Sequence, residues 1–425
     1  MANLEVEFCG VRFKNPMIVA SIEPTNSPAQ IKSCIDAGAA GTVVKTLGDV
    51  KQMTVLTDNS RYAILNDRGD VIKGKVPRNF TFYSRSGYST TYYKDWVPYL
   101  KDLHAYAEER GAHVIGSVGS KDIKGWIDIA RTIEDCGIRM VELNFGCPHP
   151  ALIPGVTGGS LIGQDPQLAA EITRQVVEAL DIPVIVKLTP DQSRPLQLAK
   201  SCMEAGASAV TATNRHTGFA IDIDTAEPRI GGTAGIGGPW VKPLTLRWVH
   251  EIYSKLGIPI TGSNGIFDAR DAVEFLMAGA RLMQIGSVLM IKGIKWLPKV
   301  IEGLSQFMDS HGYPDVESMI GVASRKAAGS YQDLFQRPRH HATIEADSCQ
   351  NPSCDICIQM CFYEAMSQGE GQVKLHLKNC IGCELCYNVC PFDAVRIVPT
   401  SEEQLRAGYF KPPEEGFIHD FHHAD

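Results

Sequence analysis

Eight of the thirteen cysteines in this 425-residue chain lie in its last fifth, in two sets of four. The second set follows the pattern Cys-x2-Cys-x2-Cys-x3-Cys-Pro over residues 380–391, and the first is a looser copy, Cys-x4-Cys-x2-Cys-x3-Cys, over residues 349–361. Closely spaced thiolates on a tight loop are the soft ligands that iron–sulfur clusters require. The two sets therefore predict two [4Fe–4S] clusters and a small domain folded around them.

The ligand sets of these clusters follow from a rule of two-cluster ferredoxins, in which the fourth cysteine of each set binds the other cluster. The predicted ligands are Cys349, Cys354, Cys357 and Cys390 for one cluster, and Cys380, Cys383, Cys386 and Cys361 for the other. Structural zinc is the alternative, because paired Cys-x2-Cys units also bind that ion, but the x2-x2-x3 spacing before proline favours iron–sulfur. The x4 gap leaves open whether Cys349 is a ligand.

The composition is ordinary for a globular protein, with 44% hydrophobic and 21% charged residues. No apolar run reaches the length needed to cross a bilayer, and the chain opens MANLEVEF without an apolar signal segment. We therefore expect a cytoplasmic protein without disulfides. A net charge of −7 and no basic stripe argue against a nucleic-acid or membrane partner.

Short β-rich apolar runs alternate with stretches of helical periodicity through the first three quarters of the chain. The runs are 17–21, 41–46, 113–118, 140–146, 183–189, 209–214, 259–265 and 282–287, and the clearest helical stretches are 165–180, 195–205 and 269–278. Three Ala-Gly-Ala units, at 37–39, 205–207 and 278–280, fit left-handed helix stops. Eight such units predict an α/β fold, the (β/α)8 TIM barrel, with a doubly wound open sheet as the alternative.

Four segments are predicted along the chain. The barrel occupies residues 1–335, a linker 336–347, a small α+β ferredoxin-like domain with the two clusters 348–400, and an acidic tail 401–425. Pro412 and Pro413 argue against regular structure in the tail. Its histidines, His419, His422 and His423, either bind metal adventitiously or lie on a solvated terminus.

Polar residues follow the predicted strands, where a barrel carries its chemistry. Two long segments, 80–93 and 231–238, are predicted to be functional loops over the same end. Three dipeptides late in the barrel, Gly237-Gly238, Asn264-Gly265 and Gly286-Ser287, present backbone N–H groups where barrels commonly bind a phosphate. They predict a cofactor phosphate site, although glycine also serves plain turns.

Three further segments, 144–149 (NFGCPH), 187–190 (KLTP) and 212–214 (ATN), complete a resemblance. The chain resembles the FMN-containing dihydroorotate and dihydropyrimidine dehydrogenases over about residues 4–400. Its domain order is most similar to that of bacterial NAD-dependent dihydropyrimidine dehydrogenase subunits, which fuse an FMN barrel to a two-cluster ferredoxin domain. The resemblance implies an oxidoreductase that transfers a hydride and a proton across a C–C bond of a small cyclic substrate, in the manner of pyrimidine metabolism.

The resemblance also implies roles for single residues. The flavin would be bound by Ala20, Ser21, Lys45, Thr46, Asn144 and Lys187, and its phosphate by Gly237, Gly238, Asn264, Gly265, Gly286 and Ser287. A fixed cation such as Lys187 stabilises an anionic reduced flavin. Cys147 would be the general acid or base, since a thiol titrates near working pH; the alternative is a small buried residue at a strand end.

The predicted substrate contacts are Ser84, Ser86, Asn144, Asn214 and Arg215. Relatives carry Asn and Glu where this chain has Ser84 and Ser86, and a threonine where it has Arg215. Losing a carboxylate and gaining a guanidinium predicts an anionic substrate, because arginine binds carboxylate and phosphate in two-point fashion. In the alternative, Arg215 points away and pairs with Asp222 or Asp224.

No G-x-G-x-x-G opens a helix after a strand, so electrons are expected to come from a flavin- and NAD-binding subunit or from ferredoxin. A homodimer or hetero-oligomer is expected. One alternative function keeps the machinery but acts on another anionic cyclic or aromatic acid, or on its activated ester. Two others are an RNA dihydrouridine-forming flavoenzyme, disfavoured by the acidic charge, and a non-catalytic electron-transfer subunit.

Overall fold

The computed structural model describes residues 2–153, 156–327, 339–349, 353–369 and 373–406, in two compact units, 1–327 and 328–425. The predicted barrel end at residue 335, Pro412, Pro413 and the three tail histidines lie outside the described residues. No helix in the described ranges is long and apolar enough to span a membrane.

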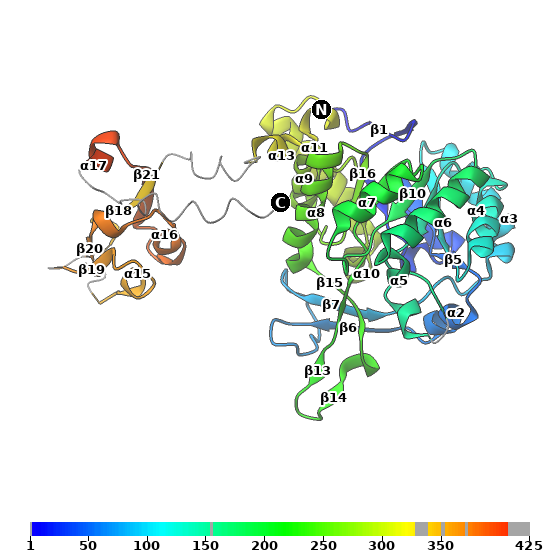
Figure 1. Ribbon diagram of the computed structural model, residues 1–425, viewed down its shortest axis with the longest axis horizontal. Coiled ribbons are helices and arrows are strands. Elements are labelled where there is room, and N and C mark those ends of the chain that lie inside the picture. Colours follow the sequence, from blue (N-terminus) through cyan, green and yellow to red (C-terminus); the bar gives the residue numbers. More distant parts are fainter. Residues whose placement is uncertain (1, 154–155, 328–338, 350–352, 370–372, 407–425) are drawn as a thin grey trace. The chain divides into compact units, whose positions relative to one another are not determined.

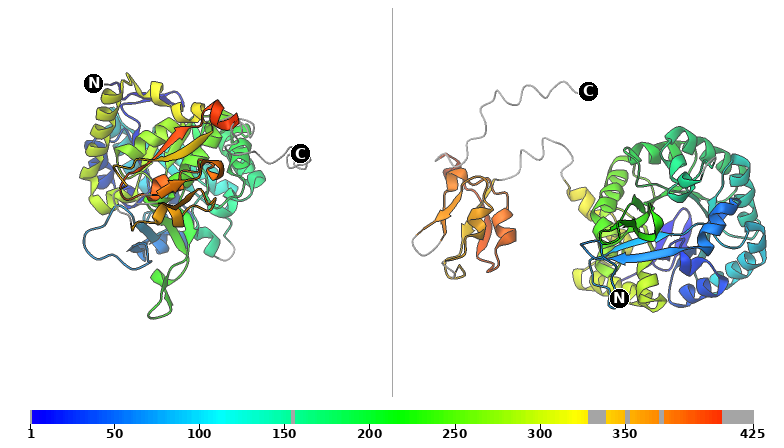
Figure 2. Two further views of the ribbon diagram at one scale, coloured as in Figure 1. Left: turned by 90° about the vertical axis from the view of Figure 1, so that its left-hand side faces the viewer. Right: turned by 90° about the horizontal axis from the view of Figure 1, so that it is seen from below.

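The first unit is a closed barrel of eight parallel strands (Figures 1 and 2). In ring order its strands are β3 (Met17–Val19), β4 (Gly41–Val43), β8 (His113–Gly119), β9 (Val141–Asn144), β10 (Val184–Lys187), β11 (Ala209–Ala212), β16 (Ile260–Ser263) and β17 (Leu282–Ile285). The ring closes because β4 pairs with both β3 and β8, and β17 pairs with β3. Each predicted apolar run coincides with one strand, to within one residue for β8, which confirms the barrel and makes the open-sheet alternative wrong.

Eight helices form the outer ring seen in Figure 2. They are α1 (Pro28–Asp36), α3 (Val97–Glu108), α4 (Ile123–Glu134), α6 (Pro166–Ala179), α7 (Pro195–Glu204), α8 (Lys242–Leu256), α9 (Ala269–Ala278) and α11 (Leu297–His311). Local sequence sets several ends: the Asp165 carboxylate caps the first turn of α6. The predicted left-handed stops are confirmed at Gly38, Gly206 and Gly279, whose φ values are +98°, +100° and +118°.

Smaller elements complete this unit. They are β1 (Val6–Phe8), β2 (Val11–Phe13), a 3-10 helix at Glu23–Thr25, β5 (Leu47–Gly48), α2 (Lys51–Asp58), α5 (Ser160–Gly163), β13 (Ile221–Asp222), β14 (Glu227–Pro228), α10 (Ser287–Lys292), α12 (Val316–Met319) and α13 (Val322–Lys326).

A four-stranded antiparallel sheet, β12-β15-β7-β6, is built from the segments after the second and sixth barrel strands (Figure 1). Its strands are β6 (Arg61–Leu65), β7 (Thr81–Arg85), β12 (His216–Gly218) and β15 (Ala234–Gly237). We call it the cap sheet. The segments 80–93 and 231–238, predicted to be functional loops, thus contain strands: β7 is rich in strand-forming residues, and the distant β15 supplies its partner backbone.

The second unit contains two antiparallel strand pairs and short helices. These are β18 (His340–Ile344) with β21 (Val395–Pro399), β19 (Met366–Gln368) with β20 (Val373–Leu375), α15 (Ile356–Gln359), α16 (Leu385–Val389) and α17 (Glu402–Arg406). Part of the predicted linker is thus a strand: β18 pairs along its whole length with β21 and buries Ala342. Local composition does not predict this pairing, because the partner strand β21 lies far along the chain. The first turn of the predicted tail also forms α17.

Candidate active site

A cavity opens at the carboxyl ends of the barrel strands. It brings together most of the predicted site residues: Ala20, Ser21, Lys45, Thr46, Ser86, Asn144, Cys147, Lys187, Asn214, Arg215, Gly237, Asn264, Gly265, Gly286 and Ser287. Residues that the sequence did not single out also line it, among them Glu23, Phe82, Thr213, Ser263 and Gln284. Two predicted residues, Ser84 and Gly238, do not.

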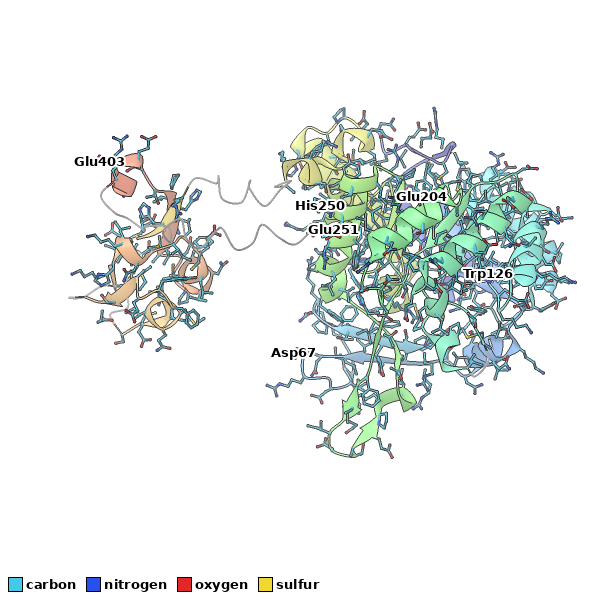
Figure 3. All side chains as sticks on the ribbon, viewed as in Figure 1. Asp67, Trp126, Glu204, His250, Glu251 and Glu403 are labelled. Atoms are coloured by element: carbon cyan, nitrogen blue, oxygen red, sulfur yellow. The ribbon has the colours of Figure 1, made fainter. Side chains whose placement is uncertain are left out.

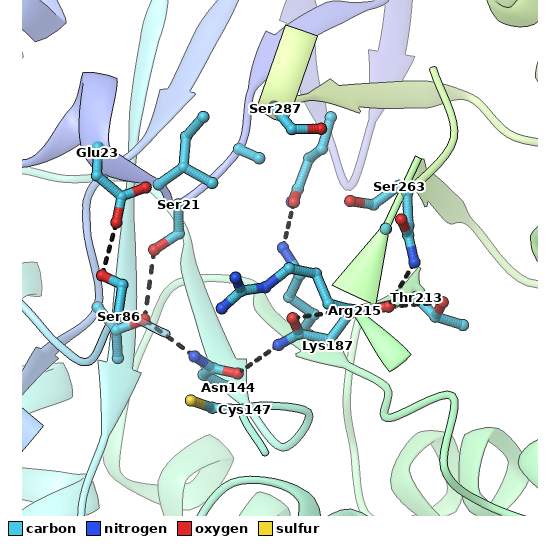
Figure 4. Close-up of a pocket in the computed structure, with 18 of the residues that line it drawn as sticks. Ser21, Glu23, Ser86, Asn144, Cys147, Lys187, Thr213, Arg215, Ser263 and Ser287 are labelled. Atoms are coloured by element: carbon cyan, nitrogen blue, oxygen red, sulfur yellow. Dashed lines mark hydrogen bonds between the residues drawn. The ribbon is translucent and has the colours of Figure 1, made fainter. Parts of the chain in front are cut away.

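Side-chain hydrogen bonds link four strand ends across this cavity (Figure 4). Asn144 donates to the Thr46 hydroxyl over 3.0 Å, and Asn214 donates to the Asn144 carbonyl oxygen over 3.0 Å. The Thr46 hydroxyl also lies 3.3 Å from that of Ser21. Each residue sits on a different barrel element, so the rigid barrel determines their spacing and the network holds their rotamers.

Lys187 is a buried cation at the cavity wall, with a relative exposure of 6%. Its ammonium donates to the side-chain oxygen of Gln284 and lies 3.4 Å from Glu142, which is fully buried inside the barrel. Glu142 also accepts hydrogen bonds from Thr211, at 2.8 Å, and from Gln284. The sequence did not identify Glu142 and Gln284, because neither belongs to a motif. A single polar residue within a predicted strand does not show which residue it contacts.

The other end of the cavity suits a phosphate. Gly265, Gly286 and Ser287 line it, and their backbone N–H groups donate no hydrogen bond within the described part of the chain. Figure 4 shows Ser287 across the pocket from Cys147. Free backbone donors beside glycines are what an FMN phosphate requires. Gly238 has a different role from the one predicted: at φ +146° it packs so closely on the carbonyl oxygen of Phe80 that a side chain would clash.

Cys147 is 6% exposed and lies at the opposite end of the cavity from the candidate phosphate site. Burial raises the pKa of the Cys147 thiol, while the charges of Arg215 and Lys45 oppose that shift. Its sulfur is 3.7 Å from Nδ1 of His149. Burial and the charge of Arg215 lower the pKa of His149 to about 3, so this imidazole is neutral at working pH. The arrangement suits a thiol that holds its proton until a reacting carbon requires it.

Arg215 reaches the cavity, and its Nη1 donates to the hydroxyl of Ser84 on β7. Ser84 is fully buried and does not itself line the cavity, so its predicted substrate contact is replaced by a role in orienting Arg215. The alternative pairing of Arg215 is not seen: Asp222 binds Arg229 at 3.0 Å, and Asp224 donates its N–H to Asp222.

Glu23, on the 3-10 helix after β3, is the principal site residue that the sequence missed. Its carboxylate accepts hydrogen bonds from Lys45 at 2.9 Å, Ser86 at 2.6 Å and Tyr62 at 2.7 Å. Burial opposes its charge, but these donors outweigh burial and hold the pKa of Glu23 well below its usual range. The loop after the second strand has Ser86 where a carboxylate was expected in relatives, but Glu23 brings a carboxylate to Ser86 from a different loop.

In the second unit, the cysteines gather into two groups. Cys361, Cys380, Cys383 and Cys386 line one pocket. Burial raises the pKa of Cys357, and the neighbouring thiols of Cys349, Cys354 and Cys390 add to that shift. This grouping suits two cluster sites, and it places Cys349 near Cys357.

Backbone N–H groups also point at the cysteine sulfurs. Ala365 donates to Cys361 at 3.3 Å, Ala342 to Cys380 at 3.4 Å and Ala394 to Cys390 at 3.3 Å. Such hydrogen bonds stabilise the anionic sulfurs of iron–sulfur clusters. Among the described residues, no three His, Cys, Asp or Glu side chains form a group that could bind one metal ion.

Comparison with known proteins agrees with both units. Residues 76–308 match the dihydroorotate dehydrogenase family, and residues 373–396 match the 4Fe-4S binding domain. The dihydroorotate dehydrogenase B (NAD(+)) catalytic subunit of Methanothermobacter thermautotrophicus is 32% identical over 75% of this chain and 98% of its own length. The corresponding subunit of Pyrococcus abyssi is 31% identical over 75% of this chain and 99% of its own. The chain therefore belongs to the dihydroorotate dehydrogenase family of FMN oxidoreductases, which act on CH–CH groups, and carries a 4Fe-4S binding domain.

Proposed function

We propose that this chain adds or removes a hydride and a proton across a C–C bond of a small anionic ring compound, using FMN in the barrel and two [4Fe–4S] clusters in the second unit. The observation that carries the proposal is that Cys147 and Lys187 line one cavity. FMN bound there would supply hydride transfer, and the clusters would supply single-electron transfer.

The chain's own residues supply the remaining chemistry. Cys147 gives or takes the proton at the substrate carbon beside the one that exchanges the hydride. Lys187, held by Glu142, presents a fixed positive charge where negative charge develops. Asn144 and Asn214, joined to each other, position the ring. Phe82 and Gly237 of the cap sheet line the same cavity, and the sheet limits the access of these groups to water.

The charges of the cavity favour an anionic substrate. Lys45 is paired with Glu23 and Lys187 with Glu142, whereas Arg215 makes no ion pair within the described residues. One positive charge is thus left for a ligand, and a guanidinium suits a carboxylate or phosphate. Cyclic or aromatic acids, or their activated esters, are the substrates to test, with uncharged pyrimidines as the comparison.

Replacing Arg215 with alanine is expected to raise KM for the physiological acid by about 10- to 100-fold, because one charge-assisted contact is lost. The measurement is steady-state kinetics with reduced viologen under argon. Arg215→Lys keeps the charge but loses the two-point geometry, and we expect an intermediate KM. An unchanged KM in the alanine variant would reject the anionic-substrate proposal.

Anaerobic purification tests the cofactors directly. We expect one FMN and about eight irons per chain, since each cluster holds four. Cys383→Ser should reduce iron to about four per chain while FMN is retained. The matched control is Cys9→Ser, a cysteine in the barrel unit whose loss should leave iron at the wild-type value. Colourless protein, or zinc in place of iron, contradicts the proposal.

The proposed partner is an electron-transferring subunit that binds flavin and NAD, or else ferredoxin. Two relatives named above are catalytic subunits of NAD-dependent enzymes, which supports the first choice. Co-purification with a flavin- and NAD-binding protein would identify it.

A further inference from the structure

The carboxylate of Glu23 uses only one of its two oxygens. The ammonium of Lys45 and the hydroxyls of Ser86 and Tyr62 all donate to Oε1. Oε2 accepts no hydrogen bond from any described residue. Glu23 lines the cavity, and its side chain is 28% exposed. One oxygen is therefore held by the protein, and the other remains available to a ligand.

An ionised carboxylate oxygen can only accept hydrogen bonds. A ligand group that reaches Oε2 must therefore carry an N–H or O–H, and a ring oxygen or carbonyl at that point would be repelled. Arg215 has the opposite character, because a guanidinium can only donate. Its Nη1 is occupied by Ser84, and its Nε and Nη2 donate to no described residue.

The small side chains of Ser84 and Ser86 account for this arrangement. They lie two residues apart at the end of β7, and each hydroxyl holds one long charged side chain from another element: Ser84 holds Arg215, and Ser86 holds Glu23. The strand thus orients both groups. Figure 4 shows Glu23 beside Ser86 and Arg215 further across the pocket.

We propose that Glu23 determines substrate specificity: its Oε2 accepts a hydrogen bond from a ring N–H or O–H of the substrate, while Arg215 binds the anionic group of the same molecule. The inference rests on the proposed function and narrows its substrate to cyclic acids that carry a donor on the ring. Acids that present an acceptor at that position are rejected. Glu23 is a specificity residue because it faces the ligand without exchanging a proton with it.

Two isosteric probes test the assignment: pyrrole-2-carboxylate carries a ring N–H, and furan-2-carboxylate carries a ring oxygen in the same place. Calorimetric titration of the full-length, FMN-loaded chain should show the pyrrole acid binding about 10- to 100-fold more tightly, the range expected for a hydrogen bond to a charged group. Glu23→Gln should bring the two Kd values within about threefold, since its amide can present its carbonyl oxygen to the pyrrole N–H or its NH2 to the furan oxygen. Glu251→Gln, a surface control, should keep the wild-type ratio.

Three outcomes would overturn the assignment: equal Kd values in the wild type, binding of neither acid, or an unchanged ratio in Glu23→Gln. Arg215→Ala provides the second comparison, because it should weaken the binding of both acids equally and leave the ratio of their Kd values unchanged. The FMN content of the same preparations reports on the proposed function separately. A flavin-loaded chain without discrimination overturns the role of Glu23 alone, whereas a chain that binds no FMN overturns both proposals.

Discussion

Replacement of Cys147 by serine is expected to lower kcat by about 10²- to 10⁴-fold, the usual contribution of a positioned general acid or base. Serine preserves the shape of the side chain, but a hydroxyl holds its proton far more tightly than a thiol. The binding of FMN and of the substrate should be retained, because the Asn144 and Lys187 contacts do not involve the sulfur. The measurement is the rate of flavin reduction by substrate in single turnover.

Cys136→Ser is the matched control for this prediction. Cys136 is also buried, and its thiol donates to the carbonyl oxygen of Thr132, a bond that serine can reproduce. It lies at the end of α4, so its replacement should leave kcat at the wild-type value. If Cys147→Ser reduced the flavin as fast as the wild type, the thiol would have no part in proton transfer.

Replacement of Glu142 by alanine is expected to lower the free energy of unfolding of the barrel unit by about 3–5 kcal/mol, because it leaves Lys187 as an uncompensated buried charge. The measurement is urea unfolding of FMN-free protein followed by tryptophan fluorescence. All five tryptophans lie between residues 96 and 296, so the signal reports on this unit alone.

Two further variants complete the comparison. Glu251→Ala removes a surface ion pair with Arg247 on α8 (Figure 3). It should lower the free energy of unfolding by only about 0.2–1 kcal/mol. The double variant Glu142→Leu, Lys187→Met removes both buried charges and should recover most of the stability, since apolar replacements of a buried pair are often neutral. It should nevertheless lose activity, because it lacks the cation that is proposed to bind the flavin. Wild-type stability of Glu142→Ala would show that Lys187 does not depend on this partner.

Most of the barrel could be predicted because its signals are local. Each strand is a short apolar run, and polar residues such as Lys45, Asn144 and Lys187 lie at or just after the strand ends. Closure of the ring then places those ends at one mouth, as the fold requires. The two cysteine sets could be predicted for the same reason, because the spacing of the cysteines within each set indicates an iron–sulfur site.

The parts that could not be predicted depend on contacts between distant segments. The cap sheet needs β15 beside β7, and its segments were therefore predicted to be loops. The strand β18 needs β21 beside it, and its segment was therefore predicted to be a linker. Glu23 carried no motif, and only the path of the chain after β3 brings it to Ser86. Ser84 was assigned to the substrate, although its hydroxyl holds Arg215.

The sequence by itself determined the barrel, the residues at its strand ends and the cysteine spacing, because periodicity and spacing are properties of neighbouring residues. Only the tertiary structure decided which charges neutralise each other. Lys45 meets Glu23, Lys187 meets Glu142, and Arg215 is left without an ion pair in the described part of the chain. Those pairings arise where separate strands and loops converge, and the proposed charge of the substrate rests on them.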